Sequence, residues 1–169
     1  MKTLILYSSC DGQTQKIAQF MAEKLIAEVR SISDNVPDLA EFDRIIIGAS
    51  IRYGHFNKLL YQFIEKNIAL LNRKQTAFFG VNLTARKAGK DTPETNSYVK
   101  KFLQRIHWNP TLCAVFAGAL LYPRYGWFDR MMIRFIMKIT GGETDTSKEI
   151  EYTDWQKVDK FAEQLKQLN

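Results

Sequence analysis

Cysteine is scarce in this chain of 169 residues, which contains Cys10 and Cys113 only. Two cysteines do not make a disulfide framework or a metal site, so we expect neither disulfides nor a bound metal. A reducing, cytoplasmic setting fits this composition best.

Long apolar runs are also lacking, and none approaches the roughly 20 residues that a membrane-spanning helix needs. The first residues, MKTLILYSSCDGQ, offer one lysine and a very short apolar run, which is too little for a signal peptide. Repeats, low-complexity tracts and linkers are absent as well. We therefore expect one domain over residues 1–169.

The chain does have ample apolar and basic residues. A 46% apolar content, with 12% aromatic residues, can bury a substantial core. The formal net charge of +6, from 24 basic and 18 acidic residues, favours an anionic partner. That partner could be a phosphate, a carboxylate, a nucleic acid or an anionic membrane surface.

Apolar runs typical of strands alternate with amphipathic segments along nearly the whole chain. The strands are predicted at 2–7, 43–50, 75–83 and 112–122, with a weaker edge strand at 29–33. The helices are predicted at 12–29, 58–71, 95–106 and 154–168, the last capped by Thr153 or Asp154. This alternation predicts an α/β fold with a five-stranded parallel sheet, helices on both faces and the flavodoxin-like order 2-1-3-4-5.

The first strand is followed by SSCDGQT, residues 8–14. Its hydroxyl groups, a glycine that lets backbone N–H groups turn inward, and the positive end of the next helix together suit a phosphate. The spacing is neither GxGxxG nor GxxxxGK[ST], which disfavours a dinucleotide site or a P-loop. On composition alone, an ordinary helix cap explains the stretch equally well.

Two further loops follow strands and should meet the first loop at one edge of the sheet. The stretch 48–57, GASIRYGHFN, places an aromatic ring, a cation and a histidine beside a glycine, which could border a flat ring or simply connect strand to helix. The stretch that begins with Asn82, Thr84, Arg86 and Lys87 is either part of the same site or a solvated basic loop.

The runs LILYSSCDGQT, IIIGASIRYGH, VNLTARK, TPETNSY, AGALLYPRY and KITGGETDTSKE carry a resemblance that covers essentially the whole chain. The phosphate loop resembles that of flavodoxins. The wider chain resembles the bacterial quinone-dependent protoporphyrinogen IX dehydrogenases, a family of long-chain flavodoxin homologues in haem synthesis. One departure is Asp11, since flavodoxins usually have a hydroxyl residue there. A carboxylate would repel a phosphate, so we expect Asp11 to turn toward backbone N–H groups or Thr14.

The resemblance implies FMN as cofactor, bound by the three loops. The implied cofactor-binding residues are Ser9, Cys10, Asp11, Gly12, Gln13, Thr14, Ser50, Ile51, Arg52, Tyr53, Gly54, Asn82, Leu83, Thr84, Ala85, Arg86 and Tyr122. No catalytic base can be assigned from the sequence, and the candidates are His55, Tyr53 and Arg52.

A segment of about 121–150 breaks the alternation and matches the place where long-chain flavodoxins interrupt their last strand. Its centre, 127–139, has nine apolar residues in thirteen, and a helix would align its cations in one stripe. Three interpretations stay open: packing on the domain, contact with an anionic membrane, or binding of a tetrapyrrole with propionates. The residues concerned are Arg124, Tyr125, Trp127, Arg130, Arg134 and Lys138.

The activity implied by the resemblance is oxidation of protoporphyrinogen IX to protoporphyrin IX in three two-electron steps. Menaquinone or ubiquinone would be the acceptor, on the cytoplasmic side of the inner membrane. A flavodoxin-type electron carrier and a general flavin quinone reductase remain alternatives, although simple carriers are usually acidic. A nucleic-acid partner would leave the three loops unexplained, so none is expected, and homo-oligomerisation is left open.

Overall fold

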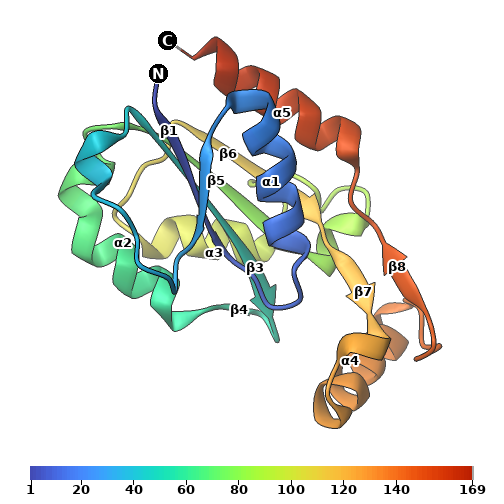
Figure 1. Ribbon diagram of the computed structural model, residues 1–169. Helices are drawn as coiled ribbons and strands as arrows, with labels where there is room; N and C mark the ends of the chain where they lie inside the picture. The colour runs from blue at the N-terminus through green and yellow to red at the C-terminus, as the bar shows by residue number, and fades with distance from the viewer. Residues whose placement is uncertain (169) are drawn as a thin grey trace.

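Five parallel strands form the main sheet in the computed structural model, which describes residues 1–168 (Figure 1). The strands are β1 (Thr3–Ser8), β2 (Glu28–Ser31), β3 (Arg44–Arg52), β5 (Gln75–Asn82) and β6 (Leu112–Ala117). They lie in the order β2-β1-β3-β5-β6. Counted along the chain as five strands, this is the predicted order 2-1-3-4-5.

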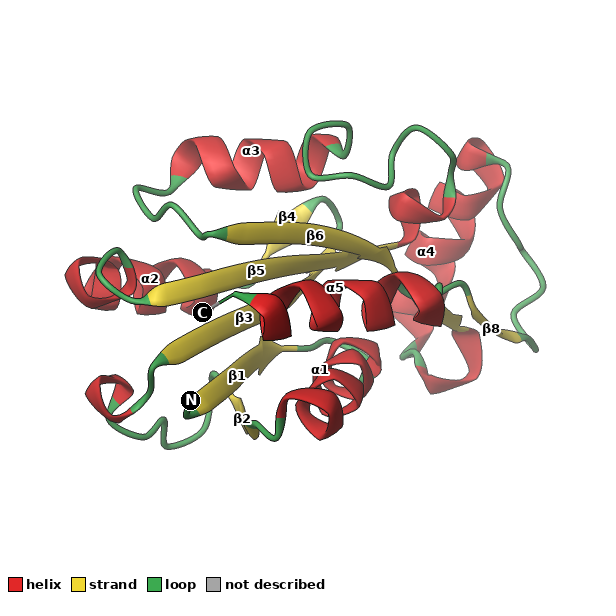
Figure 2. Cartoon of the chain, turned by 90° about the horizontal axis from the view of Figure 1, so that it is seen from above, coloured by secondary structure: helices red, strands yellow, loops and turns green. Residues whose placement is uncertain are grey.

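Helices cover both faces of the sheet, as the alternation predicted (Figure 2). Helices α1 (Gln13–Leu25) and α5 (Trp155–Gln167) pack on one face, and α2 (Lys58–Leu71) and α3 (Ser97–Arg105) pack on the other. Since successive strand side chains point to opposite faces, adjacent apolar residues separate into two cores. The first core contains Ile5, Ile46 and Phe79, and the second contains Leu4, Ile45 and Phe78.

The cap of α5 is Asp154, one of the two residues predicted for this role. Its carboxylate accepts hydrogen bonds from the backbone N–H groups of Gln156 and Lys157. The neighbouring Thr153 hydroxyl instead donates to the carbonyl oxygen of Ala117 and accepts from the side chain of Gln13. Thr153 therefore joins the end of β6 to the start of α1.

The inserted segment projects from the carboxyl end of the sheet (Figure 1). The run predicted as one strand over 112–122 divides at Gly118 into β6 and the short β7 (Ala119–Leu121). Helix α4 (Trp127–Thr140) follows, and β8 (Glu149–Glu151) returns antiparallel to β7. The segment has a small core of its own, which includes Leu120, Tyr122, Tyr125, Ile133 and Met137.

No helix within residues 1–168 is long and apolar enough to cross a membrane.

Candidate functional site

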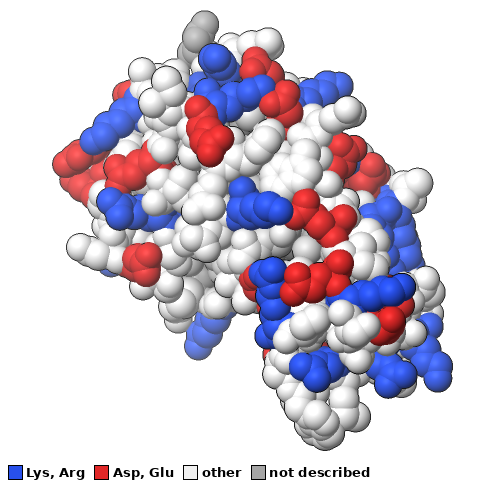
Figure 3. Space-filling model, turned by 45° about the vertical axis from the view of Figure 1, so that its right-hand side comes forward, with Lys and Arg blue, Asp and Glu red and all other residues white. Residues whose placement is uncertain are grey.

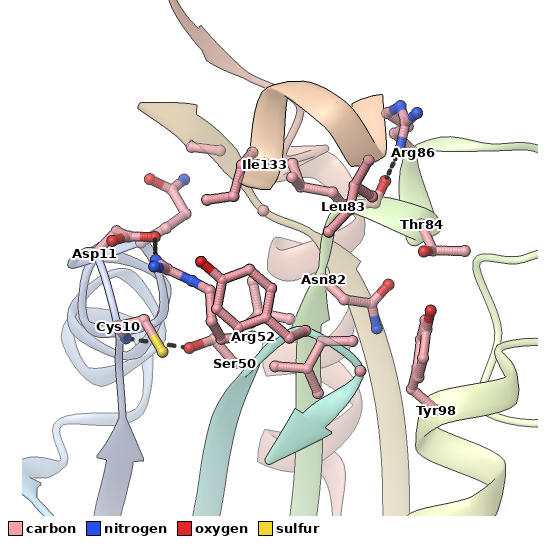
Figure 4. Close-up of a pocket in the computed structure, with 18 of the residues that line it drawn as sticks. Cys10, Asp11, Ser50, Arg52, Asn82, Leu83, Thr84, Arg86, Tyr98 and Ile133 are labelled. Atoms are coloured by element: carbon pink, nitrogen blue, oxygen red, sulfur yellow. Dashed lines mark hydrogen bonds and ion pairs between the residues drawn. The ribbon is translucent and has the colours of Figure 1, made fainter. Parts of the chain in front are cut away.

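A cavity of about 610 Å³ lies at the carboxyl ends of β1, β3 and β5, with α4 forming part of its wall (Figure 4). This is the edge at which the three loops were predicted to meet. The predicted residues that line it are Ser9, Cys10, Asp11, Gln13, Thr14, Ser50, Ile51, Arg52, Tyr53, Gly54, Asn82, Leu83, Thr84, Arg86, Lys87 and Tyr125.

The loop between β1 and α1 is folded around its own hydroxyl groups. The Ser9 hydroxyl accepts a hydrogen bond from the Gly12 N–H at 2.9 Å, and Ser50 of β3 accepts one from the Cys10 N–H. Gly12 has φ of 94°, a left-handed conformation that a residue with a side chain rarely adopts. The first N–H groups of α1 have no acceptor within the helix, and Gln13 and Thr14 in this first turn line the cavity.

Thr14 is the most informative residue of this loop. It is fully buried, it lines the cavity, and its hydroxyl is the one buried side-chain N or O atom among residues 1–168 without a hydrogen-bond partner. An unpaired buried hydroxyl costs free energy, about 1–3 kcal/mol, so its presence beside free N–H groups indicates a ligand oxygen at this position. The residues present therefore fit a phosphate.

Asp11 differs from the expectation. Its carboxylate is paired with the Arg52 guanidinium, and the prediction that it turns toward Thr14 or backbone N–H groups is wrong. Burial alone would lower the pKa of Arg52, but the hydrogen bond and negative charge of Asp11 outweigh it and raise that pKa. The pair removes the repulsion that a free carboxylate would exert on a phosphate in the same loop.

The loop after β3 is a tight hairpin that the sequence did not reveal. Arg52 and His55 are paired across it, with the two-residue strand β4 (His55–Phe56) running antiparallel to β3. Tyr53 and Gly54 form the turn with φ values of 53° and 80°. Positive φ at both central residues is the pattern of a type I′ turn, and this turn places Tyr53 at the cavity, which it lines.

Asp129, in the first turn of α4, contacts Arg52 and Tyr53 of this hairpin. The Tyr53 hydroxyl donates a hydrogen bond to Asp129, and the Arg52 guanidinium lies 3.2 Å from the same carboxylate. Burial, reinforced by Asp129, raises the pKa of the Tyr53 phenol. Tyr53 therefore stays a neutral donor, and neither it nor Arg52 is a free base.

Two buried amides fix the loop after β5. The side chains of Asn82 and Asn96 donate to each other at 3.1 and 3.0 Å. Asn82 also accepts from the Ala85 N–H, and Asn96 caps α3 through the Val99 N–H. Sequence reasoning missed Asn96, although an asparagine directly before a helical segment is a recognisable capping signal.

The far wall of the cavity is apolar and comes from the insertion. Ile133 and Met137 of α4 are buried, and Met132 and Ile136 line the same wall. Tyr125 also lines the cavity. Its hydroxyl accepts a hydrogen bond from the Leu121 N–H, and the Arg52 guanidinium carbon lies 5.2 Å from the centre of its ring. Burial raises the pKa of the Tyr125 phenol. The cavity thus pairs a polar, phosphate-compatible end with a surface suited to a flat apolar ligand.

Several predicted residues lie elsewhere. His55 is exposed and lines a separate groove with α2, so it does not face the cavity. Tyr122 is buried in the core of the insertion, where its hydroxyl donates to the Glu143 carbonyl oxygen at 2.6 Å. Gly12 and Ala85 shape their loops through the backbone and do not line the cavity.

The cations expected to form one stripe on α4 differ in their surroundings. Arg130 donates to the carbonyl oxygens of Tyr122 and Tyr125 and is half-buried, so it is a structural residue. Arg134 and Lys138 are exposed, as is Trp127, and none of the three lines the cavity. Arg124 is paired with Glu149 on the surface.

Metal ligands do not gather at this site. In the part of the chain that the structure describes, no three His, Cys, Asp or Glu side chains are grouped as a metal ion requires.

Comparison with known proteins places this geometry in a family. A family model described as a flavodoxin domain matches residues 4–147. A protein of Escherichia coli named protoporphyrinogen IX dehydrogenase (quinone) is 51% identical over 99% of this chain and 96% of its own length. A protein of Leishmania major with the same name is 48% identical over 95% of this chain and 73% of its own length.

A solved structure of a Lactobacillus acidophilus flavoprotein in complex with FMN shares the fold, with 20% identity and a TM-score of 0.50. It covers 68% of this chain and 92% of its own length. The chain therefore belongs to the flavodoxin domain family and, within it, to the family of proteins named protoporphyrinogen IX dehydrogenase (quinone).

Proposed function

We propose that this protein uses FMN to oxidise protoporphyrinogen IX to protoporphyrin IX, with a membrane quinone as acceptor, in haem biosynthesis. The observation that carries the proposal is the buried, unpartnered Thr14 hydroxyl at the start of α1, in a cavity whose far wall is the apolar side of α4. The names of the relatives supply the substrate and the class of acceptor.

The residues that would hold the FMN phosphate are Ser9, Thr14 and the backbone N–H groups at the start of α1. The hairpin at Tyr53 and the loop fixed by Asn82 would border the ring system on its two sides. When bound, the flavin supplies two-electron chemistry between the substrate and the quinone.

The reaction removes six electrons and six protons from protoporphyrinogen IX, and three quinones become three quinols. The protein has to bind a large apolar macrocycle beside the flavin. Met132, Ile133 and Ile136 offer the apolar surface that such a body requires. Arg52 and Tyr53 would act by positioning, because their polar groups are already engaged with Asp11 and Asp129.

We further propose that α4 contacts an anionic membrane surface, where the quinone is found. Large apolar side chains on the outward side of α4 are exposed, among them Trp127 at 73%, Phe128 at 63%, Phe135 at 59% and Ile139 at 68%. Figure 3 shows this end of the molecule projecting, with uncharged surface at its tip and Lys and Arg beside it. An apolar ridge flanked by cations is the pattern of a helix that lies on a membrane.

An anaerobic assay tests the proposed reaction. FMN-loaded protein is mixed with protoporphyrinogen IX and a menaquinone analogue, and porphyrin fluorescence is followed against flavin-free protein. We expect porphyrin formation that requires both FMN and the quinone. Porphyrin formation no faster than autoxidation in the flavin-free control would contradict the assignment and favour a simple electron carrier.

A further inference from the structure

Lys87 and Lys90 line the cavity, and neither has a part in the proposed binding of FMN. Both belong to the loop between β5 and α3, and they line the same cavity as Ser97 and Tyr98 at the start of α3. The Lys87 ammonium donates to the carbonyl oxygen of Thr140 at 3.0 Å. Within residues 1–168, no carboxylate is within ion-pair distance of either lysine.

At the part of the cavity lined by Lys87 and Lys90, no carboxylate of the described residues neutralises the positive charge of the lysines. Asp11 is the one carboxylate among the lining residues of the described chain, and it is already paired with Arg52. Asp91, the acidic residue next to Lys90, is paired with Lys157 outside the cavity. The lysines therefore leave uncompensated positive charge beside an apolar wall, which favours an anionic group on the ligand.

This positive end is distinct from the phosphate-compatible end. The unpartnered Thr14 belongs to the loop after β1, whereas the lysines belong to the loop after β5, and β3 lies between these two strands in the sheet. Leu83 and Ile133 provide apolar lining of the same cavity, and both are labelled in Figure 4. A ligand that reaches the lysines along this wall must combine an apolar body with an acidic group.

We propose that Lys87 and Lys90 bind the propionate carboxylates of the tetrapyrrole. This inference rests on the proposed function and names the part of the site that recognises the acidic edge of the substrate. We assign propionate binding to these two lysines and not to the cations of α4. Arg130 donates to carbonyl oxygens, and Arg134 and Lys138 do not line the cavity. An ammonium with three donors can keep its bond to Thr140 and still bind a carboxylate.

Porphyrin binding to the FMN-loaded protein tests the assignment. Protoporphyrin IX and its dimethyl ester, which lacks the negative charges, are titrated in the same detergent and followed by tryptophan quenching. We expect the wild type to prefer the acid, and Lys87→Gln with Lys90→Gln to weaken acid binding about tenfold while ester binding is unchanged. Lys101→Gln, an exposed lysine of α3 outside the cavity, is the matched control and should behave as wild type.

FMN binding, followed by quenching of flavin fluorescence, separates the possible failures. We expect the double variant to bind FMN as tightly as the wild type. A double variant that keeps the preference for the acid, or that loses FMN affinity by the same factor, would overturn the carboxylate site alone. A wild-type protein that binds neither porphyrin would overturn the proposed function together with this site.

Discussion

Arg52 at the end of β3 reaches Asp129 in the first turn of α4, where Nη1 lies 3.2 Å from Oδ2. The same guanidinium is paired with Asp11 in the loop between β1 and α1. One side chain therefore connects the phosphate-compatible loop to the inserted helix. Since α4 forms a wall of the cavity, this connection is one of the contacts that hold the wall against that loop.

Asp129→Asn should loosen α4 without unfolding the protein. The Asp129 side chain is 39% exposed, so we expect a loss of only about 0.5 kcal/mol in the free energy of unfolding, but faster amide hydrogen exchange in α4. Tyr53→Phe removes the second contact to Asp129 and leaves the charges of α4 intact, so it should act in the same direction. Glu149→Gln, which breaks a surface pair with Arg124, is the control. Unchanged exchange in α4 in both Asp129→Asn and Tyr53→Phe would argue against this link.

The two cysteines should react differently with a thiol reagent. Burial, with the charge of Glu94, raises the pKa of the Cys113 thiol from 9.0 to about 11, so only about one molecule in a thousand has the thiolate at pH 8. Cys10 is exposed and lines the cavity. We expect rapid labelling of Cys10, protection of Cys10 by FMN, and labelling of Cys113 only on unfolding. Mass spectrometry of the labelled peptides distinguishes the two sites.

The raised pKa of Cys113 also predicts a pH dependence of stability. The thiol ionises more readily in the unfolded chain, so its contribution is complete below about pH 9 and is lost as the pH rises toward 11. Cys113→Ala should remove this part of the alkaline loss of stability, measured by urea unfolding at pH 8 and pH 10. An identical alkaline loss in the variant would show that Cys113 does not contribute to it.

The sheet and its three loops could be predicted from the sequence because parallel strands buried on both faces have a strong local signature. Runs such as LILY and IIIGA are continuous in apolar residues and glycine, and the polar loops follow them closely. The hairpin at Tyr53 could not be predicted, since its type I′ turn usually has Asn or Gly where this chain has tyrosine. The two-residue strand β4 is too short to show any periodicity.

Contacts between side chains of distant segments could not be predicted from the sequence either. Asp11 and Arg52 are 41 residues apart, and nothing local shows that a carboxylate in one loop meets a guanidinium in another. The hydrogen bonds of Arg130 could not be predicted either. A helical repeat of cations indicates that they share one side of the helix, but not that Arg130 donates to neighbouring carbonyl oxygens. Asn82 and Asn96 form their buried pair only after β5 and α3 are packed together.

The exposed apolar ridge of α4 should control membrane binding rather than stability. Phe128→Ser with Phe135→Ser should lower pelleting with phosphatidylglycerol vesicles by tenfold or more, because each phenyl ring contributes about 1.5–3 kcal/mol when buried. The melting temperature should hardly change, since both rings are exposed in the folded protein. Leu59→Ser, an exposed apolar residue of α2, is the matched control. Equal pelleting of the double variant and the wild type would count against a membrane role for α4.

The cations of α4 should add a charge-dependent part to that binding. Arg134→Glu with Lys138→Glu should weaken pelleting with phosphatidylglycerol vesicles and leave binding to neutral phosphatidylcholine vesicles unchanged. The effect on the anionic vesicles should shrink as salt is added, because surface charges are screened.

Thr14→Val should separate cofactor binding from stability. The variant replaces an unpartnered buried hydroxyl by a methyl group of similar size, so the flavin-free protein should be as stable as the wild type or more stable by about 1 kcal/mol. FMN affinity should fall about tenfold, because the phosphate loses a hydroxyl partner.

Thr76→Val is the matched control, since the buried Thr76 hydroxyl accepts a hydrogen bond from the Trp108 indole at 2.9 Å. That variant should lose about 1–3 kcal/mol of stability and keep its FMN affinity. Unfolding of the flavin-free proteins in urea and titration with FMN measure both quantities, and a Thr14→Val protein that binds FMN as the wild type does would remove Thr14 from the phosphate site.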